Sequence, residues 1–173
     1  MLLVKKKDGT YRFCVDFRQF NAITVKAKYP VPVIEELLDE LTHASWFPCL
    51  DLTAGYHQIR LKSGEEFKTA FQTHTGHFEF RAMAFGLTGA PATFLKAMYT
   101  TLYPLLCKCV LVFFDDILIY SRSYADHVEH LRLVFQLLQQ DQWQVKMSKC
   151  HFAQRQLRYL GHVILEEGVA TDP

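Results

Sequence analysis

The chain has 173 residues and a net charge of +1; half of its residues are hydrophobic and 14% are aromatic. This composition suffices for one or two small domains with a packed core. No apolar run approaches the ~20 residues of a membrane helix, so we expect a soluble protein with no membrane partner. Met1 leads into LLVKKKDG, which lacks the apolar segment of a signal peptide. The five cysteines form no CxxC pair, which indicates reduced intracellular thiols.

The N-terminal segment is basic and is expected to form a hairpin. Strands over Leu2–Lys5 and Tyr11–Asp16 flank Asp8 and Gly9, a strong turn signal. Between residues 5 and 28, basic side chains outnumber acidic ones. Such a segment can neutralise phosphates, although a solvated surface explains the same pattern.

The middle of the chain is expected to hold one helix followed by four strands. Ile34–Leu41 has helical periodicity and an acidic first turn, which suits the helix dipole. The strands are predicted at Phe47–Leu52, Tyr56–Leu61, Lys68–Thr73 and His77–Arg81.

The second half is expected to alternate helices and strands. The predicted elements are a helix over 92–106, strands over 110–114 and 117–120, a helix over 125–140 and a strand over 143–147. Counted from the strand at Phe47, this is the ferredoxin-like βαββαβ order, with residues 53–89 inserted after the first strand.

Two adjacent aspartates interrupt the apolar stretch VLVFFDDILIY at Asp115 and Asp116, and a third, Asp51, ends the apolar strand FPCLDL. A polar turn between two strands would by itself explain Asp115 and Asp116. In the βαββαβ order, however, the strands that carry all three are neighbours, so the carboxylates can converge. Clustered carboxylates need a counter-charge, and Mg²⁺ supplies one. Two such ions ~3.5–4 Å apart would clamp an in-line phosphoryl displacement.

Several motifs, in the same order, resemble the reverse transcriptases. FFDD is similar to the YxDD box of that family, with Phe113 in place of tyrosine. The other matching segments are VKKKDGTYRFCVDFRQFNAIT (4–24), LDLTAGYHQIRL (50–61), FGLTGAPATF (85–94) and YLGHVI (159–164). The resemblance covers nearly the whole chain. It is closest to the polymerase of gypsy-class LTR retrotransposon polyproteins, and GHFEF (76–80) and EGVATDP (167–173) look plant-like.

The resemblance implies an α+β fold, the palm of a right-hand polymerase with a fingers subdomain and without a thumb. The implied division is residues 1–45 for the N-terminal fingers, 46–53 for a palm strand, 54–89 for a fingers/palm insertion, and 90–173 for the palm with a primer-grip hairpin. The downstream RNase H and integrase segments of such a polyprotein are expected but absent. We expect the isolated chain to be weak or inactive, because the missing thumb removes phosphate contacts to the primer–template.

The resemblance also assigns catalytic roles. Asp51 and Asp115 would bind both Mg²⁺ ions, with Mn²⁺ as a substitute, and Asp116 would complete the triad. Lys149, near the end of the last palm strand, would be the candidate general acid that protonates pyrophosphate. Tyr56 would be an aromatic gate beside the sugar of the incoming nucleotide.

The remaining assignments concern the dNTP and the primer. The backbone amides of Ala54 and Gly55 would cradle the triphosphate. Lys6, with Lys5 and Lys7 as alternatives, and Arg12 would hold the phosphates from the fingers. The last two groups are Phe85 with Gly86 in the nucleotide pocket, and Tyr159, Leu160, Gly161 and His162 in the primer grip.

The implied function is that of an RNA-directed DNA polymerase that extends a primer on an RNA or DNA template with dNTPs. The family implies an intracellular location, in a cytoplasmic virus-like particle. The first alternative is a catalytically inactive, truncated retroelement remnant that retains nucleic-acid binding. The second is another palm-fold phosphotransferase, such as a nucleotide cyclase, against which the basic N-terminal segment and YLGH argue.

Overall fold

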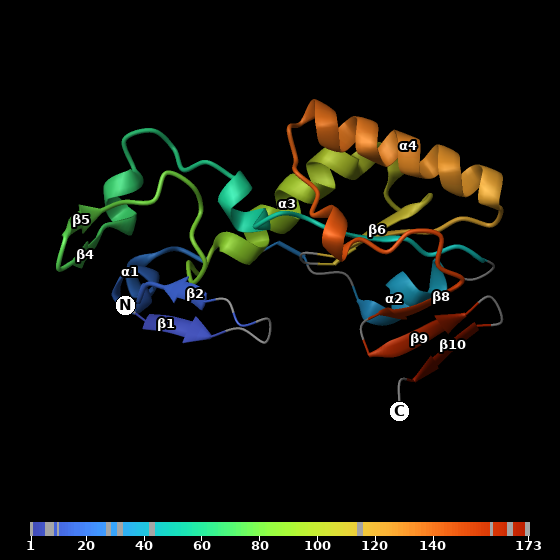
Figure 1. Cartoon of the computed structure of the whole chain (residues 1–173), viewed down its shortest axis with the longest axis horizontal. Helices are drawn as coiled ribbons and strands as arrows, with labels where there is room; N and C mark the ends of the chain where they lie inside the picture. Colours follow the sequence, from blue (N-terminus) through green and yellow to red (C-terminus); the bar gives the residue numbers. More distant parts are fainter. Residues whose placement is uncertain are drawn as a thin grey trace. The chain divides into compact units, whose positions relative to one another are not determined.

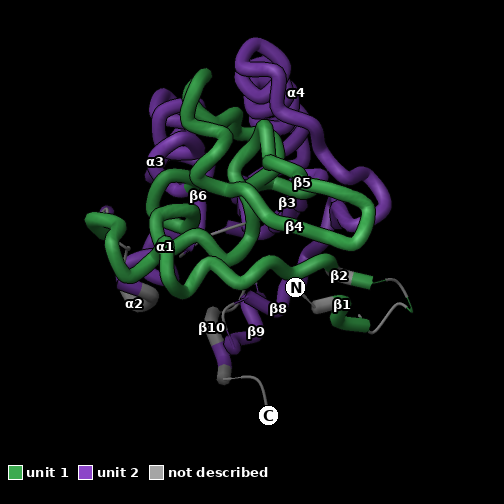
Figure 2. The backbone as a smooth tube through the Cα atoms, turned by 90° about the vertical axis from the view of Figure 1, so that its left-hand side faces the viewer, with its two compact units in different colours: residues 1–28, 54–94 green, residues 29–53, 95–173 purple. Residues whose placement is uncertain are grey.

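The computed structural model of the chain describes residues 2–5, 9, 11–26, 29–30, 33–41, 44–113, 116–159, 161–165 and 168–171. The chain divides into two compact units (Figure 2). Unit 1 comprises residues 1–28 and 54–94, and unit 2 comprises residues 29–53 and 95–173. Within the described part of the chain, every helix is too short or too polar to cross a membrane.

Unit 2 is built on a three-stranded antiparallel sheet in the order β3-β7-β6. The strands are β3 (Cys49–Asp51), β6 (Val110–Phe113) and β7 (Asp116–Ile119). Their interior positions are almost wholly buried on both faces of the sheet. Such strands read as continuous apolar runs, which is why the polar residues at their ends stand out in the sequence.

Two helices lie on one face of this sheet (Figure 1). They are α4 (Tyr124–Gln140) and, within unit 2, residues 95–102 of α3 (Ala90–Leu102). Ser123 caps α4 by accepting a hydrogen bond from the amide of Asp126 at 3.1 Å. Trp143, just after α4, donates to the Thr101 hydroxyl of α3 at 3.0 Å and so joins the two helices.

The other face carries α2 (Ile34–Asp39) and a second antiparallel sheet of β8 (Gln156–Tyr159), β9 (His162–Leu165) and β10 (Gly168–Thr171) (Figure 1). A buried cluster joins these elements to the first sheet. Its members are Leu37, Leu41, Ala44, Phe47, Leu111, Leu118, Tyr120, Leu157, Tyr159 and Ile164.

The predicted strand at Trp143–Met147 is wrong in extent. Only Val145 forms a bridge, opposite Leu52, and the chain then enters a 3₁₀ turn at Met147–Lys149. The amide of Lys146 still donates to the carbonyl of Asp51 at 2.8 Å. The βαββαβ order therefore holds for its first five elements, and the sixth is reduced to a single bridge because the 3₁₀ turn draws the chain away from the sheet edge.

The described residues of unit 1 include two hairpins and a short helix. The predicted N-terminal hairpin is confirmed: β1 (Leu2–Lys5) pairs with β2 (Tyr11–Cys14), with Lys5 opposite Tyr11. The second hairpin joins β4 (Phe71–Thr73) to β5 (Gly76–Phe78). The short helix is α1 (Arg18–Ile23), which the sequence pattern did not predict.

The predicted strand at Tyr56–Leu61 is wrong, because Gly55–Gln58 forms a 3₁₀ turn. Ala54 precedes the turn with φ 47° and ψ 51°, in the left-handed region, which reverses the chain before any strand can start. The aromatic ring of Tyr56 then contacts Phe85 and Phe94 instead of a neighbouring strand.

Candidate active site

Two of the three predicted carboxylates lie directly opposite each other in the central sheet. Asp51 is the last residue of β3 and Asp116 is the first residue of β7, and the two are register partners. Directly opposite residues in an antiparallel pair have Cβ atoms about 4.5–5.5 Å apart and point to the same face. The predicted convergence is confirmed for this pair; Asp115 lies outside the described residues.

Lys149 neutralises part of this negative charge. Its Nζ atom lies 2.8 Å from Oδ2 of Asp51, across 98 positions of the sequence. The side chains are 56% and 32% exposed, so solvent screens the pair and its contribution to stability is small. The ion pair does place the ammonium group of Lys149 at the predicted metal ligand, where a metal ion would compete with it.

The half-buried thiol of Cys49 lies beside the two carboxylates. Burial raises the pKa of Cys49 to about 12, and the neighbouring Asp116, Cys150 and Asp51 groups add to the shift. Cys49 therefore stays neutral and leaves the two carboxylates as the hard donors. Mg²⁺ is commonly held by one or two carboxylates together with water and substrate phosphates, so this donor set fits one such ion. Within the described residues, no group of three His, Cys, Asp or Glu side chains is arranged to bind a metal.

The predicted nucleotide-pocket residues come together in unit 1. The Tyr56 ring lies 4.9 Å from Phe85 and 5.3 Å from Phe94, measured between centroids. Gly86 follows Phe85 with φ +94°, a conformation that L side chains rarely adopt. Ala54, with its left-handed backbone, directs the chain into the turn that carries Gly55 and Tyr56.

Gly55 is required by the close approach of Phe94. A Cβ atom at Gly55 would lie 2.9 Å from Cε2 of Phe94, whose side chain is 1% exposed and cannot easily move away. Phe94 thus packs against both the backbone of Gly55 and the ring of Tyr56. Phe94 ends the segment FGLTGAPATF, but its residue type alone does not distinguish this supporting role from that of any core aromatic.

We expect Gly55→Ala to destabilise the protein by about 1–3 kcal/mol, because the added methyl group overpacks against Phe94. Gly89→Ala is the matched control, since a Cβ atom there meets open space. Thermal unfolding of both variants measures the difference. Equal unfolding temperatures for the two variants would refute the steric reason for glycine at position 55.

The predicted primer-grip segment forms a tight hairpin. Tyr159 ends β8 and His162 begins β9, and the two are paired. Gly161 has φ +78° in the turn between them, while Leu160 lies outside the described residues. Tyr159 is buried within the core of unit 2, and burial raises the pKa of its phenol. Its hydroxyl oxygen has no hydrogen-bond partner within the described part of the chain.

The predicted phosphate-binding residues of the fingers belong to the segment of the sequence that runs from β1 to β2, the strands of the first hairpin. Lys6 and Lys7 lie outside the described residues, as does the side chain of Arg12. The backbone of Arg12 pairs with Val4 in the first hairpin, and Lys5 is exposed at the end of β1. Their contact with a triphosphate stays a prediction.

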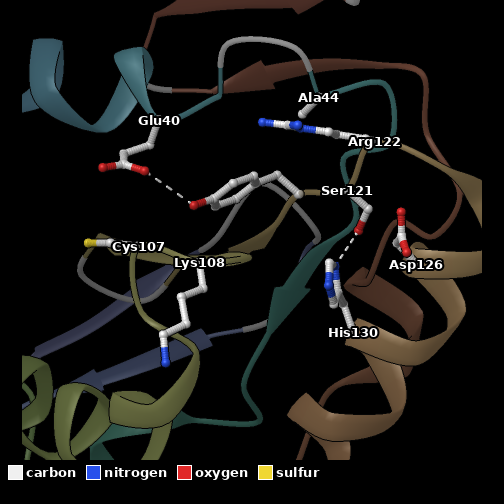
Figure 3. A pocket seen from close by; sticks show the side chains of 9 residues that line it. Glu40, Ala44, Cys107, Lys108, Ser121, Arg122, Asp126 and His130 are labelled. Atoms are coloured by element: carbon white, nitrogen blue, oxygen red, sulfur yellow. Dashed lines mark hydrogen bonds between the residues drawn. The ribbon is translucent and has the colours of Figure 1, made fainter.

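A cavity of about 320 Å³ lies in unit 2 beyond the other end of β7 (Figure 3). The hydroxyl of Tyr120 donates a hydrogen bond to the carboxylate of Glu40 at 3.4 Å, and Ser121 is hydrogen-bonded to His130 at 2.8 Å. Basic and acidic side chains both line it, so it lacks the uniformly positive character that would suit a polyanion. None of the predicted site residues lines this cavity.

Comparison with known proteins identifies the family. The family model described as reverse transcriptase (RNA-dependent DNA polymerase) matches residues 4–164. The chain belongs to the reverse transcriptase family. This match confirms the predicted family membership. Reverse transcriptases generally use divalent metal ions. This family membership agrees with the paired carboxylates and the palm-like sheet.

The relatives of this reverse transcriptase chain include polyproteins of transposons. It is 39% identical to the retrovirus-related Pol polyprotein from transposon 297 of Drosophila melanogaster, over 98% of the chain and 16% of the polyprotein. It is 47% identical to an RNA-directed DNA polymerase homolog of Oenothera berteroana, over 71% of the chain and 89% of that protein. The chain thus spans a small part of the polyproteins, and the origin in an LTR retrotransposon polyprotein is supported.

Solved structures confirm the predicted fold of this reverse transcriptase chain. The foamy viral protease-reverse transcriptase in complex with ds DNA has a TM-score of 0.89 and 21% sequence identity. The match covers 98% of this chain and 30% of that one. At this identity the likeness shows the fold, including the polymerase palm and fingers, and nothing further.

Proposed function

We propose that the chain is the polymerase part of an RNA-directed DNA polymerase that adds dNTPs to the 3′-hydroxyl of a primer on an RNA or DNA template. The observation that carries the proposal is the register pairing of Asp51 with Asp116 in a reverse transcriptase chain. We further propose that it belongs to a gypsy-class retrotransposon of a plant and acts in a cytoplasmic virus-like particle, with RNase H and integrase segments elsewhere in the same polyprotein.

The proposed metal ligands are Asp51 and Asp116 together with Asp115, whose sequence position next to Asp116 supports its inclusion. Two Mg²⁺ ions, when bound, would lower the pKa of the primer hydroxyl and stabilise the leaving pyrophosphate. The carboxylates hold the charge that attracts such ions, and the positions of Asp51 and Asp116 at strand ends keep these two on a rigid sheet. Lys149 would exchange its contact with Asp51 for one with the departing phosphate.

The dNTP would be bound by groups of unit 1, which we assign to the fingers with the neighbouring insertion. The amides of Ala54 and Gly55 would donate to the triphosphate, with Lys6 and Arg12 as its charged partners. Phe85 and Gly86 would line the base and sugar pocket beside Tyr56. Unit 2 is assigned to the palm, and its hairpin at residues 159–162 would hold the primer end.

The test is extension of an oligo(dT) primer on poly(rA) with dTTP and Mg²⁺, with enzyme in excess over primer. Low salt is chosen because binding through phosphate contacts weakens steeply as salt rises. We expect weak incorporation, which the excess of enzyme makes measurable, that stops when EDTA removes the metal and resumes with Mg²⁺ or Mn²⁺. Binding of primer–template without any incorporation would instead support the inactive remnant.

Lys149→Gln should slow dTTP incorporation by about tenfold, because a proton donor at the leaving phosphate contributes at least that much. Primer–template affinity, measured by fluorescence anisotropy, should stay within about twofold because the side chain lies at the carboxylates. Lys146→Gln is the control on the same segment. An unchanged incorporation rate in Lys149→Gln would remove Lys149 from the mechanism.

A further inference from the structure

Asn21 joins α1 to the loop that carries the proposed nucleotide pocket. Its Nδ2 donates to the carbonyl of Gly86 at 2.7 Å, and its Oδ1 accepts from the amide of Thr88 at 2.9 Å. These contacts cross 65 and 67 positions of the sequence. Both ends of one amide side chain are thus used on one short loop, an arrangement that only a group with a donor and an acceptor can make.

The loop needs this support because its backbone is irregular. Gly86 has φ +94° and belongs to neither a helix nor a strand, so its polar groups have no regular ladder to join. The backbone of Asn21 is fixed, since its backbone N–H donates to the carbonyl of Phe17 at 2.7 Å and the Phe17 side chain is buried. Asn21 is therefore held by regular helical hydrogen bonding, which the loop at Gly86 lacks.

The held loop determines where the Phe85 ring lies. Phe85 precedes Gly86 directly, and its ring contacts Tyr56 at 4.9 Å and His57 at 5.2 Å. Tyr56 is in turn supported from another side by Phe94. If the loop relaxes, Tyr56 keeps Phe94 and loses the fixed position of Phe85, so the wall of the sugar pocket loosens.

We propose that Asn21 is a positioning residue that sets the nucleotide selectivity of this chain by fixing the loop at Phe85–Thr88. The inference rests on the proposed roles of Tyr56 and Phe85 in nucleotide binding. Asn21 acts through the loop and needs no contact with substrate. Its loss should therefore weaken dNTP binding and discrimination more than it slows the chemical step.

The decisive variants are Asn21→Asp and Asn21→Ala. Asn21→Asp keeps the size of the side chain and places an oxygen against the Gly86 carbonyl, which turns an attraction into a repulsion. Gln19→Glu is the matched control, because it makes the same amide-to-carboxylate change at an exposed position of the same helix. Circular dichroism and thermal unfolding confirm that each variant is folded.

Two measurements separate the tether, which is the pair of hydrogen bonds from Asn21 to Gly86 and Thr88, from its effect on nucleotide selectivity. Hydrogen exchange measures these two hydrogen bonds: we expect the amide of Thr88 to exchange at least about tenfold faster in Asn21→Ala, because it loses its acceptor, whereas Asn21→Asp keeps an acceptor for Thr88 and loses only the donor to Gly86. Primer extension measures selectivity: we expect the KM for dTTP to rise about tenfold, kcat to change less than about threefold, and the preference for dTTP over UTP to fall. Gln19→Glu should match the unaltered chain in both.

The outcomes are distinguishable. Unchanged exchange at Thr88 in Asn21→Ala overturns the tether. Faster exchange with unchanged KM and unchanged selectivity, in a preparation where Tyr56→Val does shift selectivity, overturns the role in nucleotide choice. If the unaltered chain incorporates no dTTP, the proposed function fails and the selectivity role with it, while the exchange data still decide the tether.

Discussion

Asn substitutions at Asp51, Asp115 and Asp116 should each reduce primer extension by about 10³-fold or more, because each removes a charge that the proposed metal ions require. The geometric basis is firmest for Asp51 and Asp116, which face each other across β3 and β7. Single-turnover incorporation of dTTP at saturating Mg²⁺ measures the effect.

The same variants should remain folded. Asparagine keeps the shape of aspartate and removes the repulsion between the two carboxylates, while Asp51→Asn loses only a solvent-exposed ion pair with Lys149. Asp39→Asn makes the same change at an exposed position of unit 2 and should retain full activity. Near-normal turnover by Asp116→Asn would rule out the two-metal mechanism for this chain.

Tyr56→Val should lower the preference for dNTPs over rNTPs by about tenfold or more, which corresponds to ~1.4 kcal/mol between the two transition states. In the proposed site a ribose 2′-hydroxyl collides with the Tyr56 ring, and a deoxyribose packs on it. Shortening the side chain removes the collision at some loss of dNTP packing. The ratio of kcat/KM for dTTP and UTP measures the discrimination.

Tyr56→Phe is the control, because it keeps the ring that Phe85 and Phe94 contact and removes only the hydroxyl. It should retain the discrimination of the unaltered chain. A folded Tyr56→Val protein with an unchanged ratio would show that the sugar is selected elsewhere, and Phe85 would be the next residue to substitute.

The chemistry of this protein could be inferred from short motifs. An unpaired carboxylate within an apolar strand costs free energy, so a chain that keeps one there indicates a functional role. Asp51 and the pair at 115–116 could therefore be identified from their residue type and their apolar neighbours. The N-terminal hairpin and the helix over Ala125–Gln140 were likewise predictable, since turn chemistry and helical periodicity are local properties.

The tertiary structure alone decided the contacts between residues far apart in the chain. No local pattern relates Lys149 to Asp51, Phe94 to Gly55, or Asn21 to the loop at Gly86. The same holds for the segment after Asp51: its apolar and aromatic residues favour a strand, but the left-handed Ala54 and the rings around Tyr56 make it a 3₁₀ turn. Residue types determined which chemistry this chain can perform. Long-range packing determined which side chains hold its reacting groups in place, because packing depends on neighbours that the local sequence does not contain.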